Sequence, residues 1–183
     1  MAFIGISLTH DVCRLFSELQ IPGNRTDTAS LHITLFYLGK NLDIEHLSKA
    51  MAAAFEITQQ TKPIKIESNE INYFPVNSGS PFPIISMIES PKLLKLRKTL
   101  KNLFDERGIF YDNTFKIYRP HITLSFNSEA INRTKIDTIS WVSNELVLWG
   151  GNNGDNKVSI TLPFSLKKNE AILEKCKLKS AKR

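Results

Sequence analysis

The sequence LHITLFYLG, residues 31–39, contains the tetrapeptide HITL, and the same tetrapeptide returns at residues 121–124. The two copies begin about half the chain length apart. Because residues i and i+2 of a strand share a face, each copy places a histidine beside a threonine: His32 with Thr34, and His121 with Thr123. The isoleucine and leucine between them then point to the opposite, buried face. The repeat therefore predicts two equivalent strands, one in each half of a duplicated fold.

The rest of the chain alternates between helical and extended patterns. Asp43 is a suitable cap for a helix, and Ser90-Pro91 is typical of a helix start. The last two strands are expected to form a hairpin around residues 150–154, and no strand is expected between residues 127 and 144. This order predicts the α+β class with a largely antiparallel sheet. The expected strands are residues 2–8, 31–38, 64–74, 82–88, 121–126, 145–149 and 158–162, and the expected helices are residues 11–20, 44–55 and 91–108.

The length of 183 residues fits one domain, or two small lobes that share a core. With 42% hydrophobic and 23% charged residues, the composition is that of an ordinary soluble globular protein. We expect one bilobal domain over residues 1–166 and a basic C-terminal tail over residues 167–183. Seven Lys/Arg and two Glu lie in this tail, which therefore holds most of the net charge of +6. Two roles remain open for it: gathering a polyanion, or serving as a solvated, poorly ordered terminus.

Several classes of protein do not fit the sequence. No apolar run approaches the roughly 18 residues that a membrane helix needs. The apolar start of the chain meets Asp11 too early for a signal peptide, and Cys13 and Cys176 are too few for a disulfide framework. No Asp, Glu or Cys cluster at metal-ligand spacing accompanies the histidines. We therefore expect a cytoplasmic monomer with no metal, no other cofactor and no obligate protein partner.

The two repeated His-x-Thr units suit phosphate chemistry. Imidazole titrates near pH 6.5, so near neutrality one histidine can accept a proton while the other donates one. The hydroxyls of Thr34 and Thr123 can hold the non-bridging phosphate oxygens between the rings. The attacking group, a ribose 2′-hydroxyl or water, stays open, as does which histidine is the base. The alternative is that the two motif histidines are structural and occupy equivalent packing positions. A structural role is also what we expect for His10 and His46.

These motifs, in their sequence context, resemble the 2H phosphoesterase superfamily, and most closely its LigT-like branch of 2′-5′ RNA ligases and RNA 2′,3′-cyclic phosphodiesterases. The similarity includes the opening strand and helix, the extension LHITLFYLG, the segment RPHITL at residues 119–124 and the closing strands. It spans about residues 2–166. The resemblance implies a bilobal, pseudo-symmetric duplication with two antiparallel sheets around a central groove, and it marks His32, Thr34, His121 and Thr123 as the site.

The same resemblance implies a metal-independent enzyme that opens 2′,3′-cyclic phosphate ends of RNA or nucleotides to 2′-phosphates, in some members with 2′,5′ ligase activity. LigT-like proteins often carry arginine two residues after the second motif, whereas here Ser125 and Phe126 follow it. Arg119 and Lys40 are the candidates to neutralise phosphate instead. Phe36, Tyr37, Tyr111 and Tyr118 are candidates for stacking a base beside the groove, and core packing is the commoner role for each of them; Tyr118 and Arg119 are the pair to test first.

Two other functions remain open. One keeps the fold and chemistry but degrades 2′,5′-oligoadenylates or cyclic oligonucleotide signals, as some viral members of the superfamily do. The other is a non-catalytic module that binds RNA or nucleotides, which would not need both imidazoles. The expected partners are therefore RNA ends or small cyclic or 2′,5′-linked nucleotides.

Overall fold

The computed structural model describes residues 1–40, 42–76, 79–114, 117–150 and 158–165. The expected tail at residues 167–183 and most of the turn expected at residues 150–154 lie outside this part of the chain. The helices are α1 (His10–Glu18), α2 (Ile44–Thr58) and α3 (Pro91–Glu106), with the 3₁₀ turn η1 (Thr28–Ser30). The strands are β1 (Ala2–Ser7), β2 (Asn24–Arg25), β3 (His32–Gly39), β4 (Ile64–Tyr73), β5 (Phe82–Glu89), β6 (His121–Asn127), β7 (Thr134–Ser143), β8 (Glu145–Gly150) and β9 (Val158–Pro163).

Local sequence signals act at the helix starts. The carboxylate of Asp43 accepts a hydrogen bond of 2.6 Å from the backbone N–H of His46 and caps α2. The hydroxyl of Ser90 accepts a weaker one of 3.4 Å from the N–H of Leu93, and Pro91 is the first residue of α3. Both starts confirm the sequence prediction.

The sheet follows the order β7-β4-β5-β6-β3-β1-β8-β9, and every pairing is antiparallel. The α+β class with a mainly antiparallel sheet is confirmed. The two sheets expected from the sequence correspond to the two halves of this strand order, β7-β4-β5-β6 and β3-β1-β8-β9. They are joined between β6 and β3 through the pair Ile33↔Ile122, so a single hydrogen-bonded path runs through both halves.

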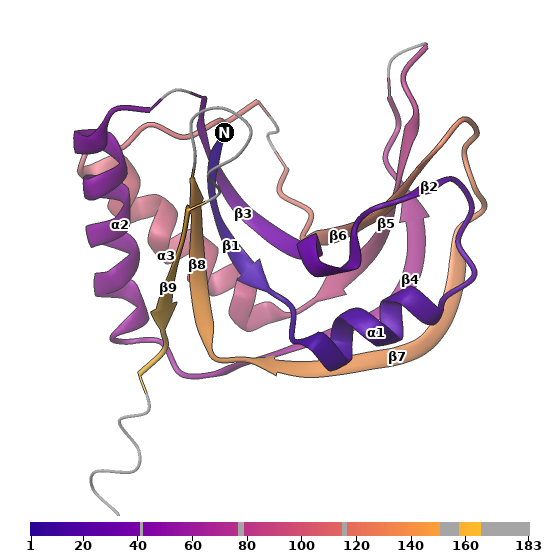
Figure 1. Cartoon of the computed structure of the whole chain (residues 1–183). Coiled ribbons are helices and arrows are strands. Elements are labelled where there is room, and N and C mark those ends of the chain that lie inside the picture. Colours follow the sequence, from indigo (N-terminus) through magenta and orange to yellow (C-terminus); the bar gives the residue numbers. More distant parts are fainter. Residues whose placement is uncertain (41, 77–78, 115–116, 151–157, 166–183) are drawn as a thin grey trace, which may run out of the picture.

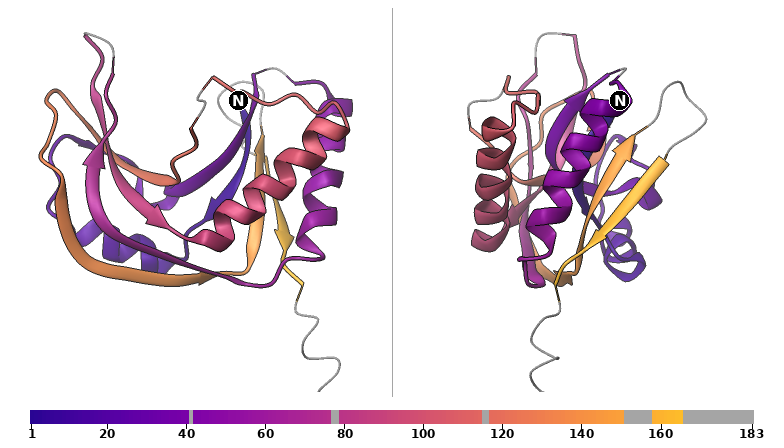
Figure 2. Two further views of the ribbon diagram at one scale, coloured as in Figure 1. Left: turned by 180° about the vertical axis from the view of Figure 1, so that it is seen from behind. Right: turned by 90° about the vertical axis from the view of Figure 1, so that its left-hand side faces the viewer.

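The two halves rise on either side of β3 and β6, as the strands curve through the molecule (Figure 1). Helices α2 and α3 pack together beside the half that contains β8 and β9, whereas α1 lies along β7 (Figures 1 and 2). The buried apolar residues of both halves form one core cluster, to which β3 contributes Ile33 and β6 contributes Ile122. No helix in the described residues is both long and apolar enough to cross a membrane.

Strand β7 was not predicted from the sequence. It pairs with β4 at the edge of the sheet, and only its last residues, among them Ile139 and Trp141, are buried. None of its first five residues is buried, so the alternation by which strands are recognised is confined to the second half of the strand. Its position became evident only through its partner β4.

Candidate active site

Both HITL motifs open a strand, and the two strands are neighbours in the middle of the sheet. His32 starts β3, His121 starts β6, and the strands meet at Ile33↔Ile122. This antiparallel register brings each histidine across from the threonine of the other motif. All four polar side chains are half-buried, whereas the two isoleucines are fully buried. We call the side of the sheet that carries His32, Thr34, His121 and Thr123 the motif face.

Strand β3 contains a β-bulge at the last residue of its motif. The register with β1 passes from Gly5↔Thr34 to Ile4↔Phe36, so Leu35 is an extra residue on β3. Such a bulge reverses the alternation of side chains between the two faces of the strand.

Strand β6 contains a bulge at the equivalent position. Its register with β5 passes from Ile85↔Thr123 to Ile84↔Ser125, so Leu124 is the extra residue. The burial sequence from histidine onward is identical in the two motifs: half-buried, buried, half-buried, buried, buried, exposed. The duplication therefore extends beyond the repeated letters to the shape of the strand.

The two imidazoles are held in the same way. Nδ1 of His32 lies 2.7 Å from the carbonyl oxygen of Ser30, and Nδ1 of His121 lies 2.8 Å from that of Arg119. Because a carbonyl oxygen only accepts hydrogen bonds, each Nδ1 carries the proton. This arrangement leaves Nε2 of both rings available for proton transfer to or from a ligand.

Aromatic rings pack beside each histidine. The rings of Phe3 and Trp149 lie 4.7 and 5.6 Å from the ring of His32, measured between centroids. Phe74 meets His121 edge-on at 4.6 Å. The sequence analysis did not select these three residues, because each comes from an element remote in sequence from the motif that it contacts. They restrict the rotation of the imidazoles and exclude water from one side of each ring.

The electrostatic environment favours the neutral form of His121. Burial lowers the pKa of His121 below its ordinary value of 6.5; its hydrogen bond to the carbonyl of Arg119 opposes this, and the charge of His32 lowers the pKa further. The interaction between the two charges is the one expected of rings that share a site. At neutral pH His121 is therefore ready to accept a proton at Nε2.

The hydroxyls of Thr34 and Thr123 complete the site. Within the described part of the chain, no other group hydrogen-bonds to either hydroxyl, and both side chains are half-exposed. Each can therefore donate to an oxygen of a bound phosphate without first breaking an internal bond. Among the described residues, no three His, Cys, Asp or Glu side chains converge in a way that could hold a metal ion.

The further candidates from the sequence lie in different surroundings. Tyr37 is 43% exposed on β3. Lys40 is exposed just beyond the end of that strand, and Arg119 has an exposed side chain while its carbonyl orients His121. The hydroxyl of Tyr118 donates to the carbonyl oxygen of Thr34 at 2.8 Å, and the guanidinium of Arg97 lies over its ring. Tyr118 thus supports β3 from beside the motif rather than offering a free ring for a base.

Arg97 of α3 is a supporting residue that the sequence analysis missed. Its guanidinium lies over the rings of Phe36 and Tyr118, at 4.7 and 4.1 Å, and its Nε donates to the carbonyl oxygen of Leu35 at 3.1 Å. It therefore binds the bulged residue of β3 directly. No sequence signal distinguishes it from the other cations on α3.

The other two aromatic candidates pack in or against the core, and the two histidines outside the motifs both lie on helices, although His10 was expected at the end of a strand. Phe36 is buried in the core beside Phe104, and Tyr111 packs against the same two rings. Nε2 of His46 lies 2.9 Å from the carbonyl oxygen of Phe110, which is a structural contact away from both motifs, and His10 is the first residue of α1.

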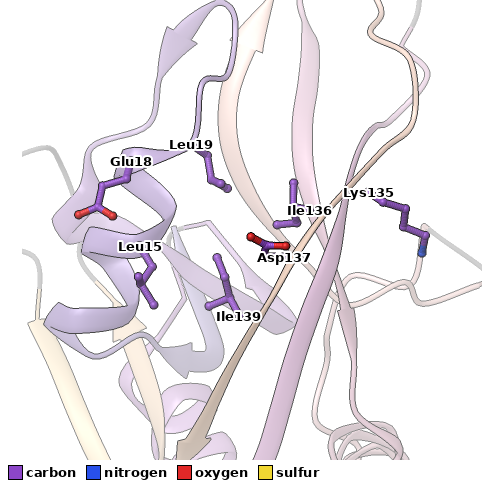
Figure 3. Close-up of a pocket in the computed structure, with 7 residues that line it drawn as sticks. All are labelled: Leu15, Glu18, Leu19, Lys135, Ile136, Asp137 and Ile139. Carbon is purple, nitrogen blue, oxygen red and sulfur yellow. The ribbon is translucent and has the colours of Figure 1, made fainter.

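A cavity of about 630 Å³ lies between α1 and β7 (Figure 3). Leu15, Glu18 and Leu19 line it from the α1 side, and residues 135–137 and Ile139 line it from β7. None of the four motif residues contributes to its walls. The cavity is therefore separate from the candidate active site.

Comparisons with known proteins identify the family and the fold. A family model described as the 2′-5′ RNA ligase superfamily matches residues 13–154. No curated protein matches the sequence. Among solved structures, the fold is similar to that of the protein TT0787 from Thermus thermophilus, with a TM-score of 0.73 and 22% identity over 91% of this chain and 97% of that chain.

The fold is also similar to that of LigT from E. coli. The structure of LigT in complex with ATP has a TM-score of 0.64 and 18% identity, over 90% of this chain and 97% of that chain. The complex with 3′-AMP has a TM-score of 0.63 and 19% identity, over 88% and 94%. The expected likeness to LigT is confirmed, and at these identities it concerns the fold alone.

Proposed function

Since this chain belongs to the 2′-5′ RNA ligase superfamily, we propose that it is a metal-independent phosphodiesterase that acts on RNA ends or small nucleotides through its two His-x-Thr units. The observation that carries the proposal is the matched anchoring of the two imidazoles. Both use Nδ1 to bind a carbonyl and keep Nε2 free beside a threonine hydroxyl. Two rings that served only to pack the sheet would not both need to be half-exposed on the same face of it.

The proposed reaction opens a 2′,3′-cyclic phosphate. Neutral His121 takes a proton from water through Nε2, and the water oxygen bonds to phosphorus. The bond from phosphorus to the ribose 3′-oxygen breaks, and protonated His32 gives its Nε2 proton to that oxygen. The product is a 2′-phosphate, and one histidine gains the proton that the other loses. Thr34 and Thr123 hold the non-bridging oxygens throughout.

The same groups serve a second substrate class. When the phosphate joins two nucleosides through a 2′,5′ linkage, the neighbouring 3′-hydroxyl takes the place of water and the 5′-oxygen leaves with the proton from His32. The reverse of this reaction is a 2′,5′ ligation. The structures of LigT with ATP and with 3′-AMP support a nucleotide as the ligand of this fold.

The direct test is hydrolysis by the purified protein in the presence of EDTA. We expect turnover of 2′,3′-cyclic AMP, of 2′,5′-linked diadenosine monophosphate or of a cyclic dinucleotide, followed by chromatography of the products. Addition of Mg²⁺, Mn²⁺ or Zn²⁺ is expected to leave the rate unchanged. Binding of these compounds without turnover would instead support the non-catalytic module. Activity that disappears with EDTA and returns with one metal would contradict a metal-independent mechanism.

The lowered pKa of His121 predicts the acid limb of the pH profile. As the base, His121 must be neutral, and a pKa held below 6.5 means that it loses its proton at a lower pH than an exposed histidine. We therefore expect kcat/KM to rise with pH and to reach half its plateau below pH 6.5. Phe74→Ala, which admits water beside the ring, should move this midpoint up toward 6.5. NMR titration of the histidine ring protons would check both values, and a wild-type midpoint above 6.5 would contradict the assignment.

A further inference from the structure

Two exposed aromatic side chains occupy equivalent positions on the two motif strands. We propose that Tyr37 and Phe126 are stacking platforms for two bases, one on each side of the bound phosphate, and that the site selects a phosphodiester that joins two nucleosides. This inference rests on the proposed function, in that it takes the phosphate to lie between the two His-Thr units.

The first observation is the matching exposure of these rings. Tyr37 and Phe126 each follow the motif threonine by three residues, and each is 43% exposed. Without the bulges, alternation would bury these positions and would expose Phe36 and Ser125, which are instead 2% and 0% exposed. Both strands therefore use a bulge to turn an aromatic ring out of the core.

The register places Tyr37 on the motif face. Tyr37 pairs with Phe3, and paired residues of antiparallel strands project to the same side of a sheet. Phe3 contacts the ring of His32 and lies 6.0 Å from Tyr37 and 4.8 Å from Trp149, measured between ring centroids. Tyr37, Phe3 and Trp149 thus form a row of aromatic rings that continues from the first histidine.

The register places Phe126 on the same face. Phe126 pairs with Pro83 on β5, and Pro83 is two residues from Ile85, the partner of Thr123. Residues i and i+2 of β5 share a face, so Phe126 and Thr123 project to the same side. On its other edge Phe126 pairs with Asn24, whose amide can bond the edge of a stacked base.

The surroundings of Phe126 favour a base over a second phosphate. The resemblance to LigT-like proteins leads one to expect arginine at this position, and phenylalanine stands there instead. Arg25 lies opposite the neighbouring Ser125, but its guanidinium donates to the carbonyl oxygens of Phe16 and Leu19 at 2.8 Å each, at the end of α1. A neutral ring offers stacking to any base and offers no charge to a phosphate.

The spacing suits a nucleotide. Three residues of strand span roughly 10 Å, and somewhat less across a bulge. A nucleotide has about this length from a phosphate beside the threonine to the far edge of its base. Two platforms related by the duplication then match the two nucleosides of a dinucleoside phosphate, whereas a terminal 2′,3′-cyclic phosphate has a nucleoside on only one side.

The test compares two substrates in matched variants. For 2′,5′-linked diadenosine monophosphate, Tyr37→Ala and Phe126→Ala should each lower kcat/KM by about tenfold or more. For 2′,3′-cyclic AMP, which has one base, only one of the two variants should do so. Tyr37→Phe and Phe126→Tyr should keep the activity of the wild type. Phe55→Ala removes a ring that is 50% exposed on α2, and it should leave both substrates unaffected.

A binding experiment separates this inference from the proposed function. The 2′,5′-linked dinucleoside phosphate that lacks the attacking 3′-hydroxyl cannot be cleaved by the proposed route, and its Kd can be measured by calorimetry. If both alanine variants bind this compound more weakly while the wild type turns over neither substrate, the stacking proposal is supported and the phosphodiesterase proposal fails. If the wild type is active and neither Tyr37→Ala nor Phe126→Ala changes the ratio of the two kcat/KM values, the stacking proposal is wrong. Should Phe126→Ala fold poorly, Phe126→Leu keeps the apolar bulk without the aromatic face and replaces it in the same comparison.

Discussion

His121→Ala and His32→Ala are each expected to lower kcat by about 10²–10⁴-fold on any substrate that the wild type hydrolyses. The expected loss is large because each ring supplies one of the two proton transfers in the proposed mechanism, and Nε2 is the only nitrogen of either ring left free by its backbone contact. The two rings act as a unit. The double variant should therefore lose little more than the more severe single variant.

The control for this prediction is another histidine of the same chain. His10→Ala changes an exposed residue at the start of α1 and should keep full activity. Single-turnover kinetics and thermal melts of all four variants would separate chemistry from folding. Unfolding temperatures close to that of the wild type are expected, because both catalytic rings are only half-buried. Wild-type activity in either single variant would refute the two-histidine mechanism.

Gly5→Ala is expected to lower the free energy of unfolding by about 3 kcal/mol, and activity should fall with it. Gly5 lies on β1, where it pairs with Thr34 on one side and Val147 on the other. A Cβ atom at this position would lie 2.3 Å from the carbonyl oxygen of Ile33, which is backbone and cannot rotate away. β1 and β3 must therefore separate, and the strand that carries His32 moves with them.

The measurement is a thermal melt together with kcat/KM. A loss of this size should lower the melting temperature by about 10 °C in a chain of this length. Gly150→Ala on the neighbouring strand β8 is the matched control, since among the described residues its Cβ would meet only the side chain of Ala2, at 3.9 Å. A Gly5→Ala protein with the stability and activity of the wild type would show that β1 and β3 can separate without cost.

The regular parts of the fold were predictable because they depend on neighbours in sequence. The period of two in HITL predicted which side of each strand is buried, and the isoleucines of both motifs are indeed fully buried. The caps at Asp43 and Ser90 act within one turn of their own helices. The structural role of His46 followed from its place on a helix outside either motif.

Other features depended on contacts between distant segments. Strand β7 has few buried side chains, so only its partner β4 identifies it. The hydroxyl of Tyr118 reaches the backbone of Thr34 across 84 positions of sequence, and Arg97 reaches Leu35 across 62. No local pattern encodes such pairs.

By itself, the sequence determined which residues are the candidates for the chemistry: a repeated His-x-Thr in an extended strand presents imidazole and hydroxyl together wherever that strand lies. Only the tertiary structure decided how these residues are arranged. It joined the two strands through one pair of isoleucines, turned both Nδ1 atoms to backbone carbonyls, and lowered the pKa of His121 by burial. It also placed a bulge at the last residue of each motif, and so exposed Tyr37 and Phe126 where alternation would have buried them. A bulge arises from the register between two strands, and register depends on the partner strand as much as on the residues of the strand itself.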